Sequence, residues 1–87
     1  MNLPLARLQD AAAVLDALAS GRLPDRTAML SAALDLNTYC RRTNADRYML
    51  DAAAGLEAFA TARTLDLDAT GRQRASKLAQ IVRQAIP

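Results

Sequence analysis

Apolar residues recur along this chain at spacings of three and four positions, the period that gathers them on one face of an α-helix. Turn-forming residues interrupt this period three times. The pattern therefore predicts four helices, at approximately residues 4–20, 25–42, 45–63 and 70–86. The connections are only about two to six residues long, so successive helices must fold back on one another. We expect an all-α protein, a small antiparallel four-helix bundle that forms a single domain over residues 1–87.

The ends of the predicted helices carry signals of their own. Pro4 is well placed at a first helical position, where its missing N–H costs nothing. Asn44 is a residue type that caps the start of a helix well, which places it before the third helix. Thr70 and Gln73 have the spacing of a capping box at the start of the fourth helix.

The second predicted helix has a broad apolar face. Its inner stripe consists of Met29, Ala33, Leu36 and Cys40, and we expect Leu30 and Leu34 to widen it. In the third helix, small residues surround Gly55, which in mid-helix costs about 1 kcal/mol relative to alanine. We expect another helix to approach closely at this glycine.

Composition supports a helical bundle with an aliphatic core. Hydrophobic residues make up 52% of the chain but aromatic residues only 3%, so that leucine and alanine must fill the interior. Both are strong helix formers, whereas the β-branched residues that favour strands are scarce. The abundance of arginine and alanine also indicates a GC-rich bacterial or phage coding sequence.

Neither cysteine usage nor hydropathy indicates an extracellular or membrane location. A single cysteine cannot form an internal disulfide, so nothing requires an oxidising compartment. No apolar run approaches the roughly 18 residues that a membrane span requires, and no signal peptide is visible. We expect a cytoplasmic protein that has no membrane partner.

The residue types that most catalytic and metal sites require are missing. The chain has no histidine, which removes the usual zinc sites and the Ser-His-Asp and Cys-His arrangements. No glycine-rich phosphate loop is present either. We therefore expect no enzymatic activity, no cofactor and no metal site.

Cys40 lies in the segment TYCRRTNADRYML, which we interpret as the turn between the second and third helices. Arg41 and Arg42 beside it would favour a reactive thiolate. Met29 and Leu36, however, share its helix face and favour a buried thiol that behaves as a small hydrophobic residue. We expect Cys40 inside the bundle and the arginines at positions 41, 42 and 47 outside it.

Nucleic-acid binding is one of two functional hypotheses. The net charge of +2 is too small to indicate a polyanionic partner. The last predicted helix is nonetheless cationic and contains no acidic residue. The residues that would contact phosphate groups are Arg72, Arg74, Lys77 and Arg83. Because no coherent set of base-reading residues is visible, this hypothesis ranks second.

The preferred hypothesis is a non-enzymatic interaction module of the adaptor, chaperone or inhibitor type, which acts through protein contacts. In an up-and-down bundle the first and third connections lie at the same end. Leu23, Leu65 and Leu67 fall in these connections and would form an apolar cluster there. Such a cluster marks an interface, and we expect it to contact a protein partner or a second copy in a homodimer.

Overall fold

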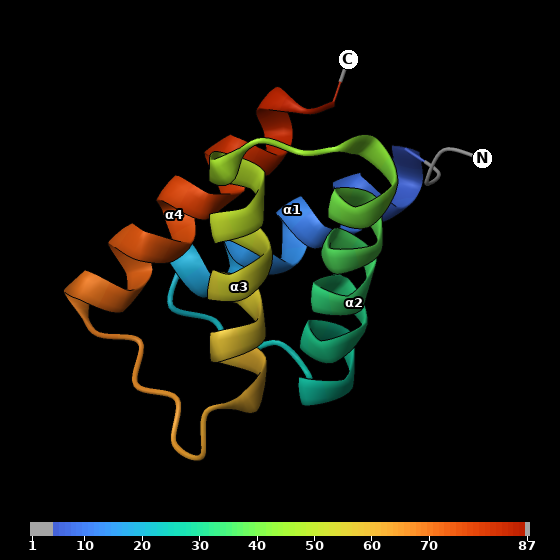
Figure 1. Ribbon diagram of the computed structural model, residues 1–87. Coiled ribbons are helices and arrows are strands. Elements are labelled where there is room, and N and C mark those ends of the chain that lie inside the picture. Colours follow the sequence, from blue (N-terminus) through green and yellow to red (C-terminus); the bar gives the residue numbers. More distant parts are fainter. Residues whose placement is uncertain (1–4, 87) are drawn as a thin grey trace.

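The computed structural model describes residues 5–86, and these form four α-helices (Figure 1). In chain order they are α1 (Leu5–Ala19), α2 (Arg26–Thr43), α3 (Arg47–Thr61) and α4 (Ala69–Gln84). The predicted all-α four-helix bundle is confirmed. The helix ends agree with the predicted ones to within two residues, apart from the start predicted at Pro4, which lies outside the described residues.

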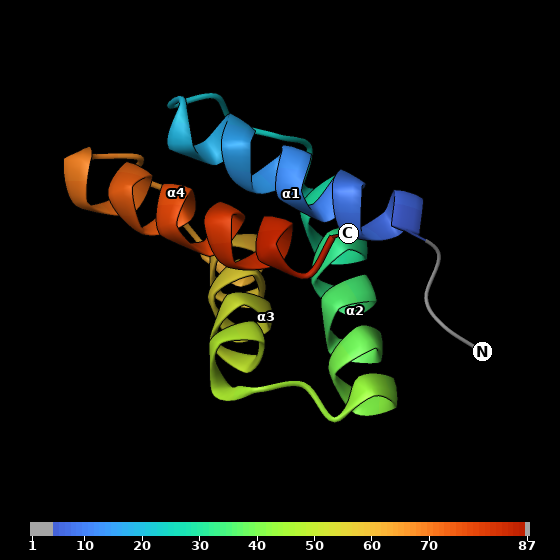
Figure 2. The same cartoon turned by 90° about the horizontal axis from the view of Figure 1, so that it is seen from above.

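The four helices form two antiparallel pairs. α1 packs most extensively against α4, and α2 against α3. Figures 1 and 2 show that the two pairs lie in separate layers and cross steeply. Figure 1 looks onto the α2–α3 layer with α1 behind it. One side of the α2–α3 layer is therefore covered by the other pair, and its opposite side faces solvent.

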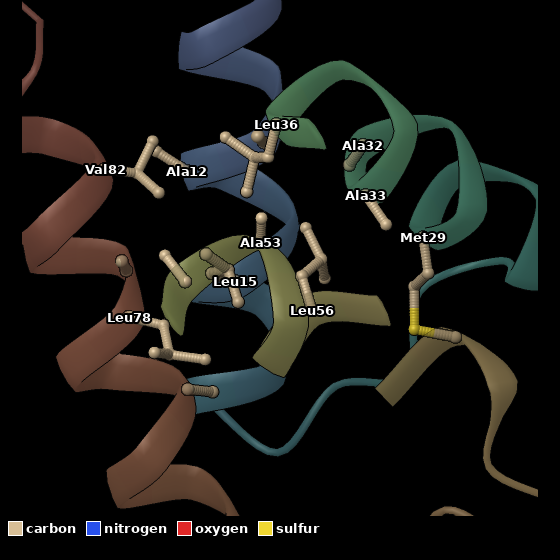
Figure 3. Close-up of a cluster of buried hydrophobic side chains, with 14 of the residues drawn as sticks. Ala12, Leu15, Met29, Ala32, Ala33, Leu36, Ala53, Leu56, Leu78 and Val82 are labelled. Atoms are coloured by element: carbon tan, nitrogen blue, oxygen red, sulfur yellow. The ribbon is translucent and has the colours of Figure 1, made fainter. Parts of the chain in front are cut away.

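The core lies where the two layers cross. Its largest fully buried side chains come from all four helices: Leu15, Leu18, Leu36, Leu56, Leu78 and Val82. Figure 3 shows all of these except Leu18 as labelled side chains in the core. Alanines fill much of the space between them, and the small side chains allow the helices to approach closely. Among the described residues no polar or charged side chain is buried. The interior is thus held by aliphatic packing alone.

The prediction that Leu30 and Leu34 widen the inner face of α2 is wrong. Leu30 is 45% exposed and Leu34 is 61% exposed, whereas Met29 and Ala33 are buried. Each residue along a helix turns the side chain by about 100°. Each of these leucines follows directly after a buried residue, and this rotation carries it past the edge of the contact with α1.

The turn between α2 and α3 also differs from its prediction. Asn44 has the left-handed conformation (φ 51°, ψ 51°) and ends α2. Asp46, with an extended backbone, is the N-cap of α3, and its carboxylate accepts a hydrogen bond from the backbone N–H of Met49 at 3.0 Å. Asparagine suits both places, because it caps helix starts and also tolerates the left-handed region. The sequence alone did not separate these two roles.

A similar correction applies to α4. The N-cap is Asp68, whose Oδ1 accepts a hydrogen bond from the backbone N–H of Gly71 at 2.8 Å. Thr70 and Gln73, predicted to form a capping box, lie inside the first turns of the helix. Aspartate at the N-cap also places a negative charge at the positive end of the helix dipole.

Gly55 lies at a close contact between α3 and α4. A Cβ atom added at this residue would lie 2.5 Å from Cδ1 of Leu78 and 3.2 Å from a guanidinium nitrogen of Arg74. Leu78 is buried and cannot move into solvent. The expected close approach of a helix at Gly55 is therefore confirmed.

We expect Gly55→Ala to lower the free energy of unfolding by about 1 kcal/mol. Alanine improves helix propensity by about 1 kcal/mol, but overpacking a filled core costs about 1–3 kcal/mol. Urea unfolding would measure the difference. In a Leu78→Val background, which lacks the clashing Cδ1, the same substitution should be neutral or stabilising. An equal loss in both backgrounds would contradict the close contact.

Substitutions in the α2–α3 turn test the two cap assignments. Asp46→Ala should lower the free energy of unfolding by about 1 kcal/mol, and Asp46→Ser should recover most of that loss because serine also caps well. Asn44→Ser should cost about 1 kcal/mol, because serine tolerates the left-handed conformation poorly. Thermal or urea unfolding would measure all three. If neither Asn44→Ser nor Asp46→Ala changed the free energy of unfolding, Asn44 and not Asp46 would be the N-cap of α3.

Candidate functional site

Exposed apolar side chains gather on the α2–α3 layer. Among the described residues, the large hydrophobic side chains that remain exposed are Leu5, Leu23, Leu30, Leu34, Tyr48 and Leu50. Four of these six belong to α2 or α3. Scattered exposed leucines are ordinary, but a contiguous group on a small protein indicates a contact surface.

Leu34 and Leu50 line one groove between α2 and α3. The groove has a volume of about 430 Å³, and Asn37, Cys40 and Arg41 complete its lining. Leu34 is 61% exposed and Leu50 is 52% exposed, so both side chains present apolar surface to solvent. Leu30 lies one turn before Leu34 on the same side of α2 and extends this surface. We call these three leucines the outer leucine cluster.

Hydrogen bonds from Arg26 hold the two helices of this layer in register. Its guanidinium group donates to the carbonyl oxygens of Ala60 at 3.2 Å and Ala62 at 2.8 Å. These carbonyls belong to the end of α3, where the last backbone acceptors lack partners within the helix. The start of α2 is thereby fixed to the end of α3. This contact sets the positions of Leu30 and Leu34 relative to Leu50.

Charged side chains flank the cluster at both ends. Arg41 lines the groove beside Leu50, and Arg47 lies one turn before Leu50 on α3. Glu57 lies two turns after Leu50, towards the opposite end of the layer. No ion pair joins Glu57 to another of the described residues. Arg26, which is bound to the end of α3, lies at the same end as Glu57, so each end of the exposed side of α2 and α3 carries a basic side chain.

Cys40 forms the floor of the groove, and the predicted burial is confirmed at 8% exposure. Burial raises the pKa of the Cys40 thiol above its ordinary value of 9.0, and the carboxylate of Asp46 raises it further. Arg41 and Arg42 are exposed and do not reverse this shift. At neutral pH the thiol is protonated, which is the opposite of an activated nucleophile.

The raised pKa of Cys40 predicts a loss of stability at alkaline pH. Above pH 9.0 the thiol of the unfolded chain loses its proton first, so the folded state binds more protons. The stabilising contribution is therefore complete below pH 9.0 and disappears as the pH rises through the folded-state pKa. Urea unfolding across this range should show a steeper decline for the wild type than for Cys40→Ala. Identical slopes, or rapid labelling of the native thiol, would contradict the assignment.

The three leucines predicted to form an interface at the bundle end differ in their exposure. Leu23 is 66% exposed, but Leu65 and Leu67 are half-buried and pack against the core. The first connection does approach the start of α4, since a Cβ atom on Gly21 would lie 3.5 Å from Cδ of Arg72. This end therefore presents less apolar surface than expected, and its role as an interface stays a prediction.

Ion pairs occupy part of the predicted nucleic-acid surface on α4. Arg74 lies 3.6 Å from a carboxylate oxygen of Asp51 on α3, and Arg83 pairs with Asp16 on α1. Arg72 and Lys77 are exposed and form no ion pair with another described residue. Although α4 itself contains no acid, two of its four cations meet acids from neighbouring helices, which weakens the attraction for phosphate.

A second hollow of about 370 Å³ lies between the α2–α3 turn and the end of α4. It brings Tyr39 and Tyr48 close to Ile81. Asp46 is the one carboxylate among its described lining residues, and this carboxylate already accepts the hydrogen bond that caps α3. Thr43 and Gln84 add polar groups to the lining, and the Thr43 hydroxyl donates its hydrogen bond to the carbonyl oxygen of Tyr39.

The described part of the chain also shows no grouping typical of metal binding. Within residues 5–86, three or more potential ligands of the His, Cys, Asp or Glu type do not come together anywhere. None of the helices in this range has the length and apolar content needed to cross a membrane. Comparison of the chain with protein families, curated proteins and solved structures finds no match.

Proposed function

We propose that this protein is a non-enzymatic interaction module that binds a protein partner through the exposed side of α2 and α3. The outer leucine cluster is the observation that carries the proposal. Three large apolar side chains stand on two adjacent helices, outside a core that is already filled. Covering them would remove apolar surface from water, which is the main driving force of protein association.

The composition of this surface fits a protein partner. Leu34 and Leu50 form an apolar centre, and Asn37 and Arg41 supply polar contacts beside it. Interfaces commonly combine an apolar centre with a polar rim. The layer beneath is rigidly supported, because Arg26 ties the ends of α2 and α3 together. A partner would therefore meet a surface that needs little ordering on binding.

Nucleic-acid binding through α4 remains the alternative proposal. It relies on four basic side chains, two of which are paired with acids. The hydrophobic surface on α2 and α3 would have no part in phosphate binding. We therefore place protein contacts first and expect any nucleic-acid binding to be weak and strongly dependent on salt.

Site-specific photo-crosslinking in cells would test the proposed surface. A photoreactive amino acid at Asn37, inside the groove, should give discrete protein adducts. The same amino acid at the exposed Gln80 of α4 should give none. Combining Leu34→Ser with Leu50→Ser should reduce the adducts at position 37 by about tenfold or more, because interface centres carry most of the binding energy.

Leu23→Ser is the matched control, because it removes an equally exposed leucine from another part of the molecule. It should leave the adducts unchanged, and thermal unfolding should confirm that all variants fold. Adducts abolished only by Leu23→Ser would instead move the interface to the end of the bundle. Absence of adducts, with co-purifying nucleic acid that is lost in an Arg72→Gln and Lys77→Gln variant, would favour the nucleic-acid alternative.

A further inference from the structure

We draw no further inference here: the strongest candidate, the hollow between the α2–α3 turn and the end of α4 that Tyr39, Tyr48 and Asp46 line, carries none, because the Asp46 carboxylate already caps α3 and nothing in the structure shows what would occupy the hollow.

Discussion

Close packing of small side chains is the constraint on which this bundle depends. Nearly half of its buried apolar residues are alanines, and one buried position on α3 is a glycine. Alanine buries little apolar area, so the helices must approach closely to exclude water and to bring enough atoms within range of dispersion attraction. The contact between Gly55 and Leu78 shows how little space is left between α3 and α4.

The same packing explains why large apolar side chains remain outside. Each layer has only one side against the other, and the buried leucines from all four helices already fill that interface. A leucine placed one residue beyond the buried stripe of α2 stays largely exposed to solvent. Leu30 and Leu34 stand in such positions, and Leu50 joins them from α3. The surface proposed for binding is thus a direct result of the two-layer architecture.

Charged side chains lie at the surface, where some of them form ion pairs between neighbouring helices. Single ion pairs link α1 to α2, α3 to α4 and α1 to α4. Exposed pairs of this kind contribute little stability. They pair Asp16, Asp35 and Asp51 with arginines of neighbouring helices, whereas Glu57 forms no ion pair with another described residue.

The sequence by itself determined the number of helices, their approximate ends, the burial of Cys40 and the close approach at Gly55. These features follow from local periodicity and from residue size, which act within a few positions along the chain. It did not distinguish the cap of α2 from that of α3, because Asn44 suits either conformation and Asp46 lies only two residues later.

The tertiary structure alone decided which apolar residues stay exposed. Periodicity locates a buried stripe but not its edge, and the edge depends on the direction from which the neighbouring helix packs. The steep crossing of the two pairs left Leu30 and Leu34 in solvent, and the third connection folded Leu65 and Leu67 against the core. Periodicity therefore did not identify the exposed leucines of α2 and α3, because burial is a property of the assembled layers and not of any single helix.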